Sequence, residues 1–361
     1  MHFPVDYASI QQRIHEVNPI QYASTRNYLN GAVSYLSPYI SRGVISTALV
    51  KEIVLKKYGT AASAKFIQEL AWREYWQRVW QHLGNKILED IKCAQPNVLH
   101  FQHLQNVLIH QTRITAIDES IATLYNSGYM HNHMRMYTAA LTCNFGRAHW
   151  LQPSQWLYSH LLDGDVASNS LSWQWVAGTF SSKQYIFDED NINKYSGINQ
   201  RNSFVKDAYS NFGNMDVPAS LLEITSHKLD TQLPACPEPA LDPALPLFLY
   251  NSYHLDPLWR KDQKANRVLV LEPSHFEQFP VSKKVLDFII GLAANIAGIS
   301  LYTGEVNELT RGFSQFKIFS KSHPAFGHYP GVHDESDWMY PSASSYYPSF
   351  SAFWRACQKQ R

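Results

Sequence analysis

Residues 1–204 repeat apolar side chains every three or four positions, which is the spacing of an amphipathic helix. Such runs include Ile45, Leu49 and Ile53, and later Ile117 and Ile121. The strict alternation that indicates a half-buried strand is scarce over the same stretch. The pattern predicts a mainly α-helical domain over residues 1–204.

The pattern changes after residue 204. Residues 205–245 run into LPACPEPALDPALP, whose prolines interrupt any helix, so we interpret 205–245 as a linker. Beyond it, the stretches 246–252, 267–273 (RVLVLEP) and 299–304 (ISLYTG) predict strands, and residues 281–298 predict an amphipathic helix. This order favours a parallel crossover. We therefore expect a smaller α/β segment over 246–361, with an irregular tail from Ser322.

Composition and charge exclude several classes of protein. Hydrophobic residues make up 45% of the 361 residues and charged residues 17%, which excludes a disordered or collagen-like chain. The net charge of +1 argues against obligate nonspecific DNA binding, but it leaves room for a local basic patch. The aromatic content of 14% suits large cores, and it also suits a protein that stacks planar rings or transfers electrons.

The cysteines and the N-terminus point to a reducing compartment. No two cysteines form a CxxC pair, so neither a structural zinc site nor a disulfide framework is expected, and a four-cysteine iron–sulfur site is the weaker alternative. The N-terminal residues lack the pattern of a signal peptide, and the apolar stretch 288–301 is too short to span a bilayer. We expect a cytoplasmic protein that binds no metal and no membrane.

The segment from Tyr129 to Asn193 carries the most chemistry. It opens with YMHNHMRM and continues to LLDGDVASNSLSWQW, in which Asp163 and Asp165 stand among apolar residues. Buried carboxylates cost several kcal/mol unless they are paired, and Arg135 is the natural partner. The alternative is a helix N-cap network around the DGD sequence.

Four segments of the chain follow one another in a fixed order. They are LSPYISRGVIS (36–46), ELAWREYW (69–76), the helix around Asp118, and the stretch from MHNHMRM to WQW, in which Trp150 precedes Asp163 by thirteen residues. Together they resemble the flavin domain of the DNA photolyase/cryptochrome family over about residues 20–195. The resemblance implies a photolyase-type helical FAD-binding domain, with FAD as its cofactor.

The resemblance also assigns residues to the cofactor. Asn169 stands where photolyases carry Asn near flavin N5, whereas plant-type cryptochromes carry Asp there and insect-type ones Cys, so Asn favours fully reduced flavin. Val33 and Tyr35 replace the family's Thr and Arg beside the phosphates. The implied set is Tyr22, Ser34 and Ser37 at the phosphates, Arg135 and Asp163 as an ion pair beside the isoalloxazine ring, Asp165 as a flavin or ribose acceptor, and Asn169.

A second implied set would face the substrate. In cyclobutane-dimer photolyases a carboxylate, an Asn, a Met and two Trp residues surround the lesion, and the matching residues here are Glu69, Asn132, Met136, Trp72 and Trp175. The alternatives are ordinary core aromatics for the two Trp residues, and for Glu69 a structural salt bridge with Arg73.

Electron supply matches the family less well. Trp173 fits the proximal position of the family's three-Trp relay and Trp150 the middle one. The distal Trp would lie near Asn97, but no Trp occurs between Trp80 and Trp150. Either another Tyr or Trp replaces it, or photoreduction is slow.

The order of the segments departs from the family, whose α/β domain precedes the flavin domain. The segment 246–361 is either a permuted counterpart of that domain or an unrelated addition. It has no GxGxxG or P-loop pattern, so independent nucleotide binding is not supported, and the antenna pigment stays unknown.

The sequence supports two hypotheses about function. The first is light-driven repair of cyclobutane pyrimidine dimers by a monomer that acts on damaged DNA, with the lesion flipped into a pocket over FAD. The alternative is a cryptochrome-like photoreceptor that signals through a protein partner. The low net charge and His133, in place of a family Arg expected to face phosphate, favour the alternative. A dark flavin oxidoreductase lacks support, because no nicotinamide-binding fingerprint is present.

Overall fold

The computed structural model describes residues 1–314 and 317–359, which separate into two compact units. The first unit comprises Met1 and residues 20–33 and 83–229, and the second comprises residues 2–19, 34–82 and 230–361. This division does not follow the predicted boundaries at 204 and 245. Composition changes along the chain, whereas the units are defined by contacts between distant segments, and α4 belongs with the α/β elements.

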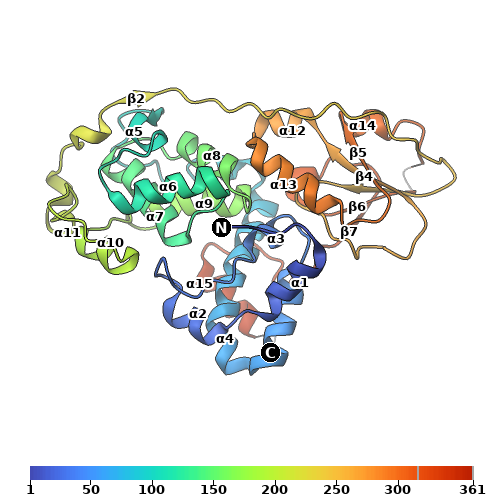
Figure 1. Cartoon of the computed structure of the whole chain (residues 1–361), viewed down its shortest axis with the longest axis horizontal. Coiled ribbons are helices and arrows are strands. Elements are labelled where there is room, and N and C mark those ends of the chain that lie inside the picture. The colour runs from blue at the N-terminus through green and yellow to red at the C-terminus, as the bar shows by residue number, and fades with distance from the viewer. Residues whose placement is uncertain (315–316, 360–361) are drawn as a thin grey trace. The chain divides into compact units, whose positions relative to one another are not determined.

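The first unit is helical (Figure 1). Its main helices are α6 (Thr115–Ser127), α7 (Asn132–Ala140), α8 (Leu151–His160) and α9 (Val166–Ala177), with α7 running into a π-helical turn at Leu141–Phe145. Helix α9 begins at the N-cap Asp165 and ends at Gly178, whose φ of 89° suits a residue without Cβ. The apolar faces of these helices form one core, in which Ile117, Leu124 and Trp150 are fully buried.

Part of the predicted linker belongs to this unit. Strand β2 (Ile224–Thr225) pairs antiparallel with β1 (His103–Leu104), and Leu221 is buried in the helical core. The short helices α10 (Glu189–Ser196) and α11 (Ala208–Asn211) precede it. The extended, proline-rich part of the chain therefore starts after residue 229.

The second unit contains a five-stranded parallel sheet with the order β5-β4-β3-β6-β7. The three predicted strands are β3 (Leu247–Tyr250), β4 (Asn266–Leu271) and β5 (Ile299–Thr303), and the predicted helix is α13 (Lys283–Ala293). Strand β3 is central, and Leu249 faces Val268 of β4 in its register. The predicted class, mainly α with a smaller α/β segment, is confirmed.

The tail from Ser322, expected to be irregular, is largely so up to Ser349, but it also contains a short strand and a final helix. Strands β6 (Ile318–Lys321) and β7 (Val332–Asp334) complete the sheet, and α15 (Phe350–Gln358) closes the described chain. The strands are too short to show alternation. Helix α15, however, carries a readable signal, because Ser349 caps it and Phe350, Phe353 and Cys357 recur at helical spacing.

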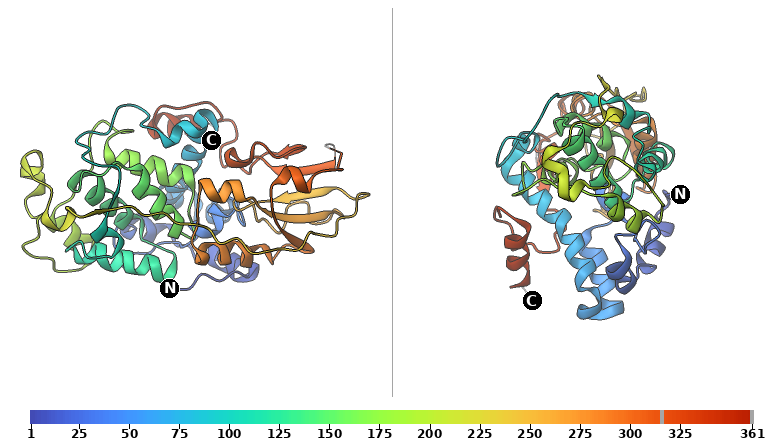
Figure 2. Two further views of the ribbon diagram at one scale, coloured as in Figure 1. Left: turned by 90° about the horizontal axis from the view of Figure 1, so that it is seen from above. Right: turned by 90° about the vertical axis from the view of Figure 1, so that its left-hand side faces the viewer.

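The second unit also contains the long helix α4 (Thr47–Leu83). This helix is interrupted at Gly59, where φ is 74° and ψ is 173°. Helices α1 (Tyr7–His15) and α3 (Ser37–Ser41) precede it, whereas α2 (Pro19–Thr25) belongs to the first unit except for Pro19. Helix α15 runs beside α4 in both views of Figure 2. Within residues 1–314 and 317–359, no helix is long and apolar enough to cross a membrane.

Candidate functional site

A buried ion pair lies between α7 and the turn that precedes α9. Arg135 Nη2 is 3.0 Å from Asp163 Oδ1 and 2.9 Å from Asp163 Oδ2. The Nε of Arg135 donates to Met130 O at 2.8 Å, which fixes the guanidinium plane. Asp163 is only 7% exposed, so the pair that the sequence indicates is formed in a largely dry environment. Removing one partner of such a pair costs about 3–5 kcal/mol.

Asp165 follows two residues later and caps α9. Its Oδ1 accepts a hydrogen bond from Ser168 N at 2.7 Å, which is the N-cap arrangement that the sequence left open as the alternative. Gly164 makes the turn possible, because a Cβ there would lie 2.8 Å from Tyr158 O. The additional role of Asp165 as a flavin or ribose acceptor stays a prediction.

Asn169 stands on the first turn of α9 and is half-buried. Its Nδ2 donates to Ser154 O of α8 at 2.8 Å, so the amide orientation is set by the neighbouring helix. The neighbouring Ser168 was not predicted as a site residue. Its hydroxyl is buried and has no hydrogen-bond partner among the described residues. Its place inside the DGDVASN sequence is the signal that could have found it.

The two predicted relay residues are both buried. Trp173 on α9 is 2% exposed and Trp150 at the start of α8 is 0% exposed. Trp150 Nε1 donates to Asp90 Oδ1 at 2.6 Å, and its main-chain N donates to Gln95 Oε1. The ring of His149 lies 5.7 Å from that of Trp150. Transfer of an electron through Trp173 and Trp150 stays a prediction.

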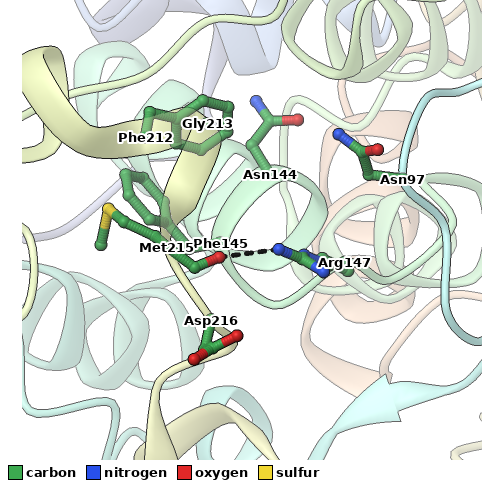
Figure 3. A pocket seen from close by; sticks show the side chains of 8 residues that line it. All are labelled: Asn97, Asn144, Phe145, Arg147, Phe212, Gly213, Met215 and Asp216. Carbon is green, nitrogen blue, oxygen red and sulfur yellow. Dashed lines mark hydrogen bonds between the residues drawn. The ribbon is translucent and has the colours of Figure 1, made fainter.

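The position expected for the distal Trp borders a pocket (Figure 3). Asn97 lines this cavity of about 280 Å³ together with Phe145, Arg147 and Met215. Arg147 Nη2 donates to Met215 O at 2.7 Å, which closes one side of the pocket. Among the described residues that line this cavity there is no indole, and the distal donor of the relay stays unassigned.

Three predicted substrate residues also belong to the first unit. Asn132 opens α7 and is exposed, Met136 stands one turn later and is half-buried, and Trp175 on α9 is 37% exposed. The Trp175 ring lies 5.8 Å from that of Tyr185. These side chains remain accessible to a ligand. A core role, the alternative for Trp175, does not fit its exposure.

The other predicted residues divide between the units. Tyr22 on α2 is half-buried and belongs to the first unit, whereas Ser34 and Ser37, both half-buried, belong to the second with Glu69 and Trp72 of α4. The structure therefore brings the Arg135, Asp163, Asp165 and Asn169 group together within one unit. The phosphate grip by Tyr22, Ser34 and Ser37 stays a prediction.

Glu69 and Trp72 have neighbours that the sequence did not suggest. Glu69 Oε1 is 2.7 Å from Lys65 Nζ one turn earlier on α4. Arg73, the partner considered for it, donates from Nη1 to Ser41 Oγ at 3.0 Å. The Trp72 ring stacks on Phe350 of α15, with centroids 3.7 Å apart and planes 10° apart. One face of Trp72 is therefore already covered.

Part of the helical unit is similar to known proteins. Residues 66–212 match the family described as FAD binding domain of DNA photolyase. The Deoxyribodipyrimidine photo-lyase of Streptomyces griseus is 30% identical over 149 residues, which is 41% of this chain and 32% of that relative. The Cryptochrome DASH of Synechocystis is 28% identical over 169 residues, or 44% and 34% of the two chains. The chain thus matches about a third of the length of these curated relatives.

A solved cryptochrome from Synechocystis is 24% identical, covers 54% of this chain and 44% of its own, and has a TM-score of 0.49. Residues 66–212 are therefore similar to the FAD-binding domain of DNA photolyases, and this similarity supports FAD as the cofactor. The side chains of this site fit an FAD cofactor. Ser168, next to Asn169 in the chain, offers a buried hydroxyl with no hydrogen-bond partner in the described part of the chain, and the Arg135–Asp163 pair provides fixed charge within the same sequence motif.

Proposed function

We propose that this protein repairs cyclobutane pyrimidine dimers in DNA by light-driven electron transfer, as a monomer. The observation that carries the proposal is the Arg135–Asp163 pair, formed between α7 and the turn before α9. Helix α9 also carries Ser168, Asn169 and Trp175, and α7 carries Asn132 and Met136. The name of the Streptomyces griseus relative, a Deoxyribodipyrimidine photo-lyase, supports the same reaction. Reduced FAD, when bound and excited, supplies the electron and takes it back, so no net redox change occurs.

The protein's own contribution is positioning and electrostatics. Arg135 and Asp163 would hold the ring system by fixed charges, because neither side chain can turn away without leaving its partner buried and unpaired. Asn169, held by Ser154 O, would present its amide in one orientation. Trp175 would offer an indole face to a flipped base, since base–aromatic stacking is worth about 1–3 kcal/mol per base. Glu69 would form a hydrogen bond with the dimer.

The test is direct repair. Purified protein with fully reduced FAD is illuminated with a dimer-containing oligonucleotide, and restored thymines are measured against a dark control. We expect repair in the parent protein and a strong loss in Asp163→Ala. FAD-loaded protein that shows no preference for dimer over undamaged DNA at low salt would exclude the proposal.

The second candidate is a flavin photoreceptor. Two observations favour it: one aromatic wall, Trp72, is covered by Phe350, and one relative is named a cryptochrome. A photoreceptor would change its protease sensitivity in residues 246–361 on illumination, with no effect on dimer DNA. The same illuminated sample, digested with trypsin, separates the two functions.

A further inference from the structure

A pocket in the second unit lies where the order of the parallel sheet reverses. The chain leaves the central strand β3 toward β4 and β5, and then returns to β6 and β7 on the other side. In open parallel sheets, ligands bind outside the carboxyl ends of the strands at such a point. A cavity of about 180 Å³ is lined there by His254 after β3, by Ser322 after β6, and by Ser46 and Thr47 at the start of α4.

The pocket is lined by buried donors, among them His254 and Trp338, that have no hydrogen-bond partner in the described part of the chain. His254 is 6% exposed, and neither ring nitrogen has a hydrogen bond within the described part of the chain. The indole Nε1 of Trp338, which lines the same pocket, is buried and likewise has no partner among the described residues. An indole N–H can only donate, and a neutral imidazole donates through one nitrogen. Both N–H groups can therefore donate to an acceptor that enters the pocket.

The imidazole of His254 is held in place. Its ring lies parallel to that of Tyr250, at 5.4 Å and 3°, and edge-on to Trp259 at 4.8 Å. Burial lowers the pKa of His254 to about 3, and the charge of Lys321 acts in the same direction. The ring is therefore neutral near pH 7. A neutral ring needs no carboxylate beside it, and its one N–H can donate a hydrogen bond to a ligand.

The start of α4 adds a third source of positive potential. The stretch from Thr47 to the break at Gly59 forms a helix of several turns, and Ser46 Oγ caps it by accepting from Leu49 N at 3.0 Å. The first N–H groups of a helix attract anions. Gly43 permits this placement, because a Cβ there would lie 2.3 Å from Tyr253 O. The loop before α4 thus rests directly on the chain that follows β3.

The charged groups of the pocket are already engaged. Lys321 Nζ is 3.2 Å from the carboxylate of Asp337, and Arg73 Nη1 donates to Ser41 Oγ. The carboxylate of Asp256 accepts from Leu258 N at 2.8 Å, and burial raises its pKa.

Glu74 is the remaining carboxylate that lines the pocket. It accepts from Met339 N at 2.7 Å and Tyr340 N at 3.0 Å. Each carboxylate of the pocket therefore has a donor of its own, whereas the N–H groups of His254 and Trp338 have no acceptor.

We infer that this pocket binds a small oxyanion, the phosphate or carboxylate group of a ligand, between His254, Trp338 and the start of α4. The volume of about 180 Å³ is below that of a pocket for a drug-sized molecule, so the ligand or its bound part is small. Nothing in this inference depends on the DNA repair proposed above.

The experiment titrates the full FAD-loaded chain with inorganic phosphate and, separately, with malonate, at constant ionic strength. Calorimetry measures affinity, and the ring ¹⁵N resonances of His254 report contact. We expect saturable one-to-one binding of at least one anion, with a His254 shift. Tighter phosphate binding identifies a phosphate ligand, and tighter malonate binding a carboxylate.

The variants locate the site. His254→Ala and Trp338→Phe should each weaken binding by about tenfold, because each removes a hydrogen bond to the same charged ligand. His254→Gln keeps an amide donor and should restore part of the affinity. His15→Ala, an exposed histidine of α1, serves as the matched control and should bind like the parent.

The inference fails if neither anion binds saturably to the folded parent, which would leave a pocket that holds water only. It also fails if His254→Gln and Trp338→Phe, both shown to be folded by circular dichroism, bind as tightly as the parent. A His254→Ala chain that does not fold is replaced by these two variants, so the result remains decisive.

Discussion

The two units satisfy their buried carboxylates in different ways. In the first unit, Asp163 is neutralised by a side chain, the guanidinium of Arg135, 28 residues earlier. In the second, Glu74 is held by the main-chain N–H groups of Met339 and Tyr340, more than 260 residues later, and burial raises its pKa. The comparison shows that a charge pair inside one motif can be recognised in a sequence. A carboxylate held by distant backbone cannot, because every residue offers an N–H.

The largest effect is expected from breaking the side-chain pair. Asp163→Ala leaves the Arg135 charge buried without its partner, so the protein should lose about 3–5 kcal/mol of unfolding free energy and its bound FAD. Absorbance of the purified protein and urea denaturation measure both. Asp216→Ala, an exposed carboxylate of the same unit, is the control and should change neither. Full retention of FAD in Asp163→Ala would remove the pair from the flavin pocket.

The next effect concerns the contact between α15 and α4. Phe350 is 8% exposed and stacks on Trp72, so Phe350→Ala should lower the unfolding free energy by about 3 kcal/mol. Phe101→Ala, at 63% exposure, should cost almost nothing. The affinity of Phe350→Ala for dimer-containing DNA gives a second measurement. If a lesion stacks on the face that Phe350 covers, Phe350→Ala binds it more tightly, and unchanged affinity would show that this face is not used.

The stability of the parent protein should fall more steeply with decreasing pH than that of the His254→Gln variant. His254 is buried and neutral, with its pKa lowered from 6.5 to about 3, so below pH 6.5 the unfolded chain binds a proton that the folded chain does not. Stability is therefore lost as the pH falls from 6.5 toward 3, at about 1.4 kcal/mol per pH unit for one such group. Urea midpoints at several pH values should fall less steeply in His254→Gln. Parallel curves would contradict the assignment.

Substitution of the two relay tryptophans tests electron transfer to the flavin. Trp173→Phe keeps a ring in the core but removes the indole, so photoreduction should slow strongly while FAD content stays unchanged. Trp150→Phe should slow it too, and it should also cost about 1–3 kcal/mol because Asp90 loses its indole donor. Flash photolysis gives the rates. Equal rates in Trp173→Phe and the parent would place the relay elsewhere.

The smallest effect belongs to the exposed pair on α4. Lys65→Ala removes the i,i+4 partner of Glu69, and such pairs contribute about 0.2–0.5 kcal/mol. Thermal unfolding should therefore barely change. If Glu69 serves the dimer, Glu69→Gln should lower the repair yield by about 10²-fold at most, since general acid assistance contributes roughly 10²–10⁴. Normal repair in Glu69→Gln would leave the class of reaction intact but remove Glu69 from the site.

Much of the architecture could be predicted from local patterns. Apolar spacing indicated the helices around Ile117 and Ile121, and continuous apolar runs indicated β3, β4 and β5. The DGD sequence indicated both the ion pair and the cap, and both are formed. These features depend on residues close together in the chain, so periodicity and spacing carry them.

Local patterns in the sequence were enough to predict the helical class of the first part and the parallel α/β arrangement of the second. They also identified the motif that joins Arg135 to Asp163. Only the tertiary structure decided that Phe350 covers Trp72, that Glu74 is held by the backbone near Tyr340, and that α4 begins at the reversal point of the sheet. Each of these unites segments more than 200 residues apart. Local spacing carries no information about which distant surfaces become neighbours, because that choice is made by burial and packing of the whole unit.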